Sequence, residues 1–258
     1  MELVNYEIQN GVAHITLNRP EKYNAVIREM ALSIQNFLTQ AATDESVRCV
    51  LLSAEGKAFC AGQDLKEFSE DNGIDVTRIV DEHYNPIVKQ IAELEKPVVC
   101  AVRGVAAGAG ANLALACDIV VAAKSASFIQ AFSKIGLIPD TGGTFYLPRM
   151  IGMPRTKALM MLAEPVSAEE AQQIGMIYKA VDDDQLDQAA SEITQRLAQM
   201  PTTAIGLIKR ALNRSLTSDL DTQLGIESQI QSTATQTADF TEGVSAFLEK
   251  RKPIFSGK

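Results

Sequence analysis

Short continuous runs of apolar residues alternate with helical stretches through the first half of the chain. Val47–Leu52, Val98–Val102 and Asp118–Ala122 have the length and composition of buried strands. Between the first two runs, apolar residues recur at helical spacing from Val76 to Leu94, and this stretch stops before Lys96-Pro97. Because strands that alternate with helices are typical of α/β proteins, the pattern predicts an α/β core.

The N-terminal segment is predicted to form a β-hairpin. Leu3–Ile8 and Val12–Leu17 are β-rich runs joined by Asn10-Gly11, a dipeptide strongly preferred in two-residue hairpin turns. A helix is expected from Ala25 to Ala42, where apolar side chains recur with helical period. Another helix is predicted to begin near Ala109 and to run to Ala116.

From about residue 154 onwards the pattern becomes helical. Ser167 to Glu170 reads as a capping box that opens a short helix ending at Gly175. Four longer helices are predicted after it: Asp184–Met200, Thr202–Leu216, Asp221–Thr235 and Asp239–Lys250. In the last of these, Asp239 and Glu242 are interpreted as a second capping box. We therefore divide the chain into a core of residues 1–195 and a C-terminal helical region of residues 196–258.

Charge and hydropathy argue against several classes of partner. The net charge of −8 makes nucleic acid or an anionic membrane surface an unlikely partner. The N-terminus lacks the pattern of a secretion signal, and the apolar stretch from Val98 to Ala123 is broken by Arg103 and by glycines, which argues against a membrane span. We expect a cytoplasmic protein.

Cysteines and histidines give no sign of a disulfide framework or a metal site. Cys49, Cys60, Cys100 and Cys117 contain no Cys-x-x-Cys pair and are expected to be reduced and mostly buried. The two histidines are far apart in the sequence and have no ligand partner at helical spacing, so no metal is expected.

Two segments rich in small residues follow predicted strands, at Ser53 to Leu65 and at Gly104 to Asn112. Small side chains allow a ligand to approach the main chain. The second segment also opens a helix, whose first N–H groups lack intrahelical acceptors and can bind a phosphate or an oxyanion. A tight loop explains the first segment equally well, and close helix packing explains the second. The glycines do not match the Gly-x-Gly-x-x-Gly pattern of dinucleotide binding.

Asp140 is the candidate proton carrier. It lies between Pro139 and Gly142-Gly143 in a segment with apolar neighbours. A carboxylate in such surroundings has a raised pKa and can move a proton near neutral pH. Taken alone, the residues favour the alternative that Asp140 caps a helix starting near Gly142.

Taken in order, these segments resemble the enoyl-CoA hydratase/isomerase (crotonase) family over nearly the whole chain. The resemblance implies a crotonase-type spiral of ββα units with a C-terminal helical trimerisation region. It also implies an acyl-coenzyme A thioester substrate, no separate cofactor, and a homotrimer or dimer of trimers. The motifs that carry it are Asn18-Arg19-Pro20, Phe59 to Leu65, Lys96-Pro97, Gly104 to Asn112, Ile138-Pro139 with Gly142-Gly143-Thr144, and Gly243 to Arg251.

The same resemblance assigns roles to individual residues. The N–H groups of Ala61 and Ala109 are expected to form an oxyanion hole for the thioester carbonyl. Lys250 is expected to approach the phosphates of coenzyme A, from a neighbouring subunit if the protein is a trimer. The main chain of three consecutive residues is expected near the adenine of coenzyme A: Gln63, Asp64 and Leu65.

The departures from the family pattern point to the reaction. The two glutamates that family hydratases use correspond here to Asn112 and Phe132, which are expected to shape the pocket instead. Asp140 occupies the position where family isomerases carry their carboxylate. The block from Ala131 to Asp140 looks like the isomerases of bacterial phenylacetate degradation, which convert ring-1,2-epoxyphenylacetyl-CoA to oxepin-CoA and shift 3-enoyl to 2-enoyl double bonds.

The function implied is therefore an acyl-CoA isomerase with one carboxylate as proton shuttle. Two enzymatic alternatives are a fatty-acid Δ3,Δ2-enoyl-CoA isomerase and an enoyl-CoA hydratase-like or thioester-hydrolysing enzyme. The non-enzymatic alternative is a catalytically degenerate subunit that only binds acyl-CoA.

Overall fold

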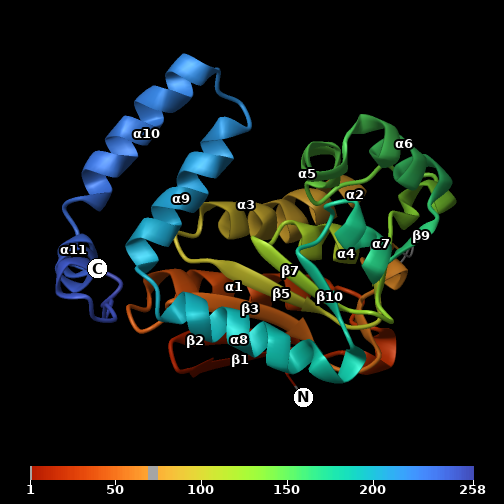
Figure 1. Cartoon of the computed structure of the whole chain (residues 1–258). Coiled ribbons are helices and arrows are strands. Elements are labelled where there is room, and N and C mark those ends of the chain that lie inside the picture. The colour runs from red at the N-terminus through yellow and green to blue at the C-terminus, as the bar shows by residue number, and fades with distance from the viewer. Residues whose placement is uncertain (1, 69–74) are drawn as a thin grey trace.

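A six-stranded β-sheet forms the centre of the computed structural model, which describes residues 2–68 and 75–258 (Figure 1). The first two strands form an antiparallel hairpin, and every later neighbour is parallel. The α/β core and the hairpin are thus confirmed. In spatial order the strands are β1 (Val4–Gln9), β2 (Val12–Leu17), β3 (Cys49–Ala54), β5 (Val98–Val102), β7 (Ile119–Ala123) and β10 (Lys179–Val181).

The hairpin turn has the backbone conformation that its sequence predicts. Asn10 and Gly11 both have positive φ angles, 51° and 79°, as a type I′ turn requires. The turn sets the register in which Val12 pairs with Gln9.

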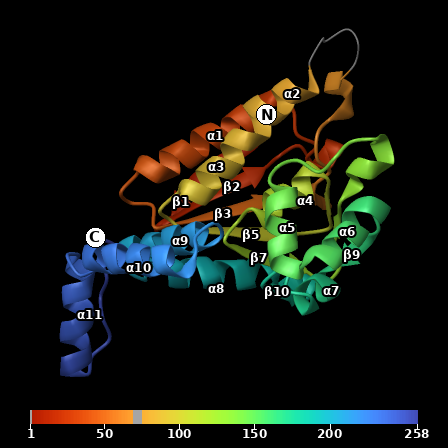
Figure 2. The ribbon, with the colours of Figure 1, turned by 90° about the horizontal axis from the view of Figure 1, so that it is seen from above.

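Both faces of the large sheet are buried, which explains the continuous apolar runs. Along β3, Val50 and Leu52 belong to the larger core on the side of α1 (Arg28–Thr43), whereas Cys49 and Leu51 pack on the side of α8 (Leu186–Ala198). Figure 1 and Figure 2 show α1 and α8 on opposite sides of the sheet. A parallel strand covered on both faces needs apolar residues at successive positions, without the alternation of a half-exposed strand.

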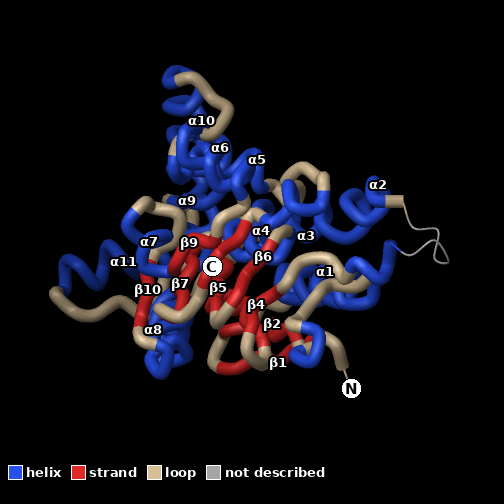
Figure 3. Tube along the Cα trace, turned by 90° about the vertical axis from the view of Figure 1, so that its right-hand side faces the viewer, coloured by secondary structure: helices blue, strands red, loops and turns tan. Residues whose placement is uncertain are grey.

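A second, four-stranded sheet is built from strands of three residues each (Figure 3). In three successive units, one strand of the large sheet is followed by one of the small sheet and then by helix: β3–β4, β5–β6 and β7–β8. This repeat is the predicted spiral of ββα units. The strands of the small sheet are β4 (Ala58–Cys60), β6 (Val105–Ala107), β8 (Ser127–Ile129) and β9 (Pro165–Ser167).

The helix predicted from Val76 to Leu94 is present but contains a π-helical segment, η4 (Val80–Tyr84), between α2 (Val76–Ile79) and α3 (Asn85–Glu93). Pro86 lacks an N–H group and cannot donate to the carbonyl of Glu82. That carbonyl instead accepts a hydrogen bond from Gln35 Nε2 at 2.7 Å. The wider turn therefore follows from the proline.

The remaining α-helices before α8 each come after a strand of the small sheet in the chain. The predicted N-cap at Ser167 is confirmed, since its side chain accepts a hydrogen bond from the N–H of Glu170. The helices are α4 (Ala109–Leu115), α5 (Gly143–Ile151), α6 (Met153–Leu162) and α7 (Ala168–Gln173), with short 3-10 segments at η1 (Pro20–Lys22), η2 (Leu65–Phe68), η5 (Ala131–Ile135) and η6 (Asp183–Gln185).

The C-terminal region consists of α9 (Thr202–Ser215), α10 (Leu220–Ala234) and α11 (Ala238–Glu249). Figures 1 and 2 show that α10 and α11 extend away from the sheets. The boundary predicted between residues 195 and 196 falls inside α8, which packs on the large sheet. Among the described residues, no helix combines the length and the hydropathy of a membrane span.

The second capping box was placed two residues too late. Thr237 caps α11 by accepting a hydrogen bond from the N–H of Phe240. Asp239 instead accepts from the N–H groups of Ser256 and Gly257, at 2.7 and 2.8 Å, and so binds the C-terminal tail. Glu242 pairs with Arg251, beyond the end of the helix.

Candidate active site

A mostly apolar cavity of about 310 Å³ lies where the loop after β4, the start of α4 and the loop before α5 meet. The structure brings together six of the nine residues predicted for the site. These six line the cavity: Ala61, Gln63, Leu65, Ala109, Phe132 and Asp140.

Glycines allow the loop after β4 to touch the start of α4. A Cβ on Gly110 would lie 2.7 Å from Cys60 Sγ and would overlap the Cys60 carbonyl oxygen. Gly62 has a φ of 87°, and a Cβ there would lie 3.0 Å from the carbonyl oxygen of Ala107 and 3.4 Å from the nitrogen of Ala109. The loop after β4 therefore passes directly over the first residues of α4.

Two main-chain N–H groups are available at this contact, those of Gln63 and Ala109. Among residues 2–68 and 75–258, neither group has a hydrogen-bond acceptor. Val26 holds the loop on both sides of Gln63, because its N–H donates to the Gly62 carbonyl at 2.7 Å and its carbonyl accepts from Asp64 at 2.9 Å. In such a bridge the N–H of Gln63 points away from Val26. Two adjacent free donors at a helix start can stabilise a developing oxyanion.

The predicted donor Ala61 is wrong. Its N–H donates to the carbonyl of Tyr23 at 3.0 Å and is not free to bind a ligand. The donor lies two residues later, at Gln63, after Gly62 has turned the chain through its positive φ. Gly62 was the available signal, but the direction of each N–H group depends on the φ and ψ angles that glycine adopts there.

The side chain of Gln63 is itself held in place. Its Nε2 donates to Glu67 Oε2 at 2.6 Å, and its Oε1 accepts from the hydroxyl of Tyr84 at 3.0 Å. Tyr84 is buried, which raises the pKa of its phenol well above the ordinary value. Tyr84 lines the cavity from the π-helical segment.

Asp140 lines the cavity as a half-buried carboxylate. Burial raises the pKa of Asp140 above its ordinary value, and a hydrogen bond from Thr141 Oγ1 to Oδ1, 2.7 Å long, opposes that rise. The capping alternative is wrong, because the N-cap of α5 is Gly142 and no side chain caps it. At the start of α5, the N–H of Gly143 donates to the main-chain oxygen of Asp140 at 2.9 Å and not to its carboxylate.

Asn112 does not line the cavity, contrary to prediction. It is buried on α4, where Nδ2 donates to the main-chain oxygen of Asp140 at 2.8 Å and Oδ1 accepts from Gln130 Nε2 at 2.8 Å. Asn112 therefore supports the loop that carries Asp140.

Asp64 and Lys250 are also not brought to the cavity. The carboxylate of Asp64 forms an ion pair with Arg19 at 2.8 Å, which ties the loop after β4 to the end of the hairpin. Lys250 ends α11, which lies far from α4 in both Figure 1 and Figure 2. Within one chain, neither residue lines the cavity.

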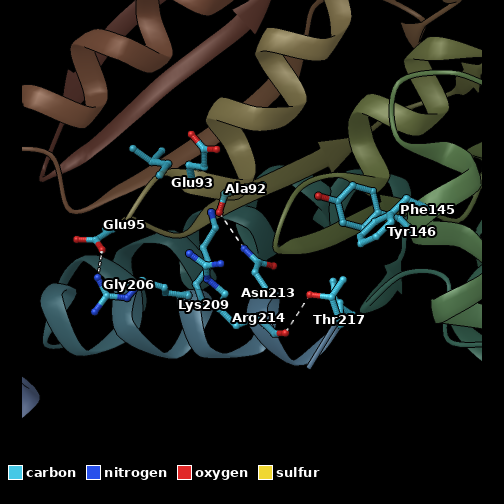
Figure 4. Close-up of a pocket in the computed structure, with 13 residues that line it drawn as sticks. Ala92, Glu93, Glu95, Phe145, Tyr146, Gly206, Lys209, Asn213, Arg214 and Thr217 are labelled. Atoms are coloured by element: carbon cyan, nitrogen blue, oxygen red, sulfur yellow. Dashed lines mark hydrogen bonds and ion pairs between the residues drawn. The ribbon is translucent and has the colours of Figure 1, made fainter. Parts of the chain in front are cut away.

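A second pocket lies between α9 and the end of α3 (Figure 4). Two of its cations have partners: the buried Lys209 pairs with Asp118 at 2.7 Å, and Arg210 pairs with Glu95 at 3.1 Å. These contacts attach α9 to the core, and none of the nine residues predicted for the site lines the pocket. Within the part of the chain that the structure describes, no three potential metal ligands gather.

Comparison with known proteins gives matches over the full length. Residues 7–258 match the family described as enoyl-CoA hydratase/isomerase. The 1,2-epoxyphenylacetyl-CoA isomerase of Escherichia coli K12 is 49% identical and covers 100% of both chains. The trans-2-decenoyl-[acyl-carrier-protein] isomerase of Streptococcus mutans is 37% identical over 98% of this chain and 97% of that one. The crystal structure of an enoyl-CoA hydratase from Bacillus anthracis superposes with a TM-score of 0.92 at 34% identity, covering 99% and 100%.

We expect Gly110→Ala to push α4 away from the loop after β4, because the added methyl group overlaps Cys60. Overpacking of this kind lowers the free energy of unfolding by about 1–3 kcal/mol. Urea denaturation measures the effect. Gly225→Ala is the matched control, because a Cβ at that helical position meets nothing within 4 Å and should leave stability equal or slightly higher. Equal stability of the Gly110→Ala variant and the wild type would contradict the tight contact.

Replacing Asp140 by asparagine should stabilise the fold at pH 7. Burial raises the pKa of Asp140 in the folded state, so the stability that its protonated form contributes below pH 4 is lost as pH rises through the folded-state pKa. Asparagine stays neutral and avoids that loss. Thermal unfolding should show a higher melting temperature for Asp140→Asn at pH 7, with the difference shrinking as pH falls. A constant difference at all pH values would contradict the raised pKa.

Proposed function

The chain belongs to the enoyl-CoA hydratase/isomerase family, and on this basis we propose that it is an acyl-CoA isomerase that works through an enolate. One observation carries the choice of isomerase. Among the described residues that line the cavity, Asp140 is the only one with a carboxylate. The two positions that correspond to the hydratase glutamates hold Asn112 and Phe132, neither of which can give up or take a proton at neutral pH.

The proposed oxyanion hole consists of the N–H groups of Gln63 and Ala109. Both donors are free among the described residues, and the close contact at Gly62 holds them near each other. They would donate to the thioester oxygen, whose negative charge grows as the enolate forms. Loss of one such donor costs about 2.7–4 kcal/mol of barrier lowering.

Asp140 is the proposed proton shuttle. Its carboxylate takes the proton from the α-carbon of a 3-enoyl thioester, and the C–H electron pair moves into the bond between the α-carbon and the carbonyl carbon, so that the carbonyl electrons collect on the thioester oxygen. When the carbonyl group reforms, the enolate electrons become the double bond between the α- and β-carbons, and the electrons of the old double bond take the proton back from Asp140 at the γ-carbon. One carboxylate is sufficient, because substrate and product are isomers and no water is consumed.

The proposed natural substrate is ring-1,2-epoxyphenylacetyl-CoA, which would be converted to oxepin-CoA in phenylacetate catabolism. The isomerase of that name from Escherichia coli K12 is 49% identical to this chain. The walls of the cavity also suit an aromatic acyl group, since Tyr84 and Phe132 contribute rings alongside Ile79 and Leu137. The product is an isomer of the substrate, so this reaction also needs no co-reactant.

A homotrimer or dimer of trimers is proposed for the assembly. Support comes from the isolated helix α11, on which Phe247 and Leu248 are 83% and 74% exposed. In such an assembly, Lys250 of one subunit would approach the coenzyme A phosphates bound beside Leu65 of another.

Sedimentation equilibrium should give a mass of three or six chains, and Phe247→Asp should shift it towards the monomer. A monomeric wild type would overturn this proposal.

The mechanism predicts the result of a proton-exchange experiment. In deuterated water, wild type should exchange the α-protons of 3-enoyl-CoA and phenylacetyl-CoA, and Asp140→Asn and Asp140→Ala should slow exchange by about 10²–10⁴-fold. Mass spectrometry of the recovered thioester measures deuterium incorporation. Asp221→Asn, on the surface of α10, is the control carboxylate and should match wild type. Full exchange in both Asp140 variants would remove this residue from the mechanism.

A further inference from the structure

Thr141, the residue after Asp140, has an unusual backbone conformation. It has a φ of 53°, in the left-handed region, and is 1% exposed. A β-branched residue is strained there, whereas glycine is not. The next residue, Gly142, has a φ of 75° and is the residue type that such a turn favours. The threonine side chain must therefore make contacts that offset the strain.

The hydroxyl of Thr141 makes such a contact. Its Oγ1 donates to Asp140 Oδ1 at 2.7 Å. Hydrogen bonds to a charged acceptor are stronger than neutral ones, and this one holds a single oxygen of the carboxylate. Among the described residues no side chain donates a hydrogen bond to Oδ2, and the remaining hydrogen bond to the carboxylate comes from the main chain of Asp140 itself.

A second contact holds the main chain of Asp140. Asn112 Nδ2 donates to its carbonyl oxygen, and Gln130 fixes the orientation of the Asn112 amide by donating to Oδ1. Asn112 and Gln130 are 1% and 2% exposed. Gly143 makes room for this amide, since a Cβ there would lie 2.7 Å from Asn112 Cγ.

We propose that Thr141 and Asn112 are positioning residues that hold Asp140 at two points, so that Oδ2 is the oxygen that exchanges the proton with substrate. Thr141 orients the carboxylate and Asn112 fixes the loop that carries it. The inference rests on the proposed role of Asp140 as the base. It assigns to Asn112 a donor function that a glutamate at the same position, ionised at neutral pH, could not perform.

The hydroxyl of Thr141 also favours the ionised base. It lowers the pKa of Asp140, against the larger effect of burial, which raises it. The other titratable groups around the cavity are Tyr84 from the π-helical segment, Lys134 from η5 and, behind Gln63, Glu67 from η2. None of them is altered by substitution at Thr141.

Three variants at Thr141 test its role through the pH dependence of 3-enoyl-CoA isomerisation. Thr141→Val keeps the shape and loses the hydroxyl. We expect kcat to fall about 10-fold or more with KM little changed, and the acid limb of kcat/KM to move to higher pH. Thr141→Ser should restore the wild-type limb. Thr141→Gly relieves the backbone strain and also lacks the hydroxyl. Its melting temperature should be no lower than that of Thr141→Val, and its kcat should be as low.

Asn112→Leu and Asn112→Asp test the second point of attachment, because neither side chain can donate to the Asp140 carbonyl. Both should lower kcat about 10-fold or more with little change in KM, and Asn112→Gln is the conservative variant that should recover part of the loss. A wild-type pH profile in Thr141→Val or Thr141→Gly, or wild-type kcat in Asn112→Leu, overturns the positioning roles.

Asp140→Asn separates this inference from the proposed function. If Asp140→Asn retains full activity, Asp140 is not the base and the proposed function fails together with the inference. If Asp140→Asn is inactive while Thr141→Val behaves as wild type, Asp140 remains the base and only the positioning role is overturned.

Discussion

The close contact between the loop after β4 and the first turn of α4 is the constraint on which the site depends. Two main-chain donors can serve one oxygen atom only if their backbones lie next to each other. Gly110 allows this by leaving space for Cys60, and Gly62 turns the chain so that its next N–H faces the cavity. All seven residues of α4 are buried, and five of them are glycine, alanine or asparagine. A helix of small residues is what permits so tight an approach from every side.

The proposed role of Asp140 as a base carries a cost in stability. Burial disfavours its ionised form, yet a base must be ionised to accept a proton. The fold offsets part of this effect with two hydrogen bonds to the carboxylate, one from the Thr141 hydroxyl and one from the main chain of Asp140 itself. The backbone strain at Thr141 belongs to the same arrangement, since a glycine there would relax the turn and remove the hydroxyl.

The sequence predicted the long elements and missed those whose structure depends on distant partners. The buried strands β3 and β5 and the hairpin at Asn10-Gly11 follow from local pattern and turn chemistry. Strands of the small sheet have three residues each, too few to show a period. Helix α6 buries only Thr156 and so has no apolar stripe to detect.

Within the site, residue types were easier to predict than their roles. The cavity contains most of the predicted residues, but choosing Ala61 over Gln63 required the direction of an N–H group, which depends on backbone angles at Gly62. The role of Asn112 required knowing that it meets the main chain of Asp140, 28 residues later. Thr141 carried no signal, because nothing in a threonine side chain indicates a left-handed backbone.

The division between main-chain and side-chain chemistry explains how one scaffold can serve two reactions. In the proposed mechanism the oxyanion donors are N–H groups, which do not change when side chains are substituted. Proton carriers are side chains, so the reaction can change when carboxylates are moved while the thioester stays where it is. Here the position on α4 that hydratases use for a glutamate holds Asn112, and its amide supports the loop that bears the new carboxylate. One substitution thus removes an acid needed for hydration and supplies a donor that helps to hold the acid proposed for isomerisation.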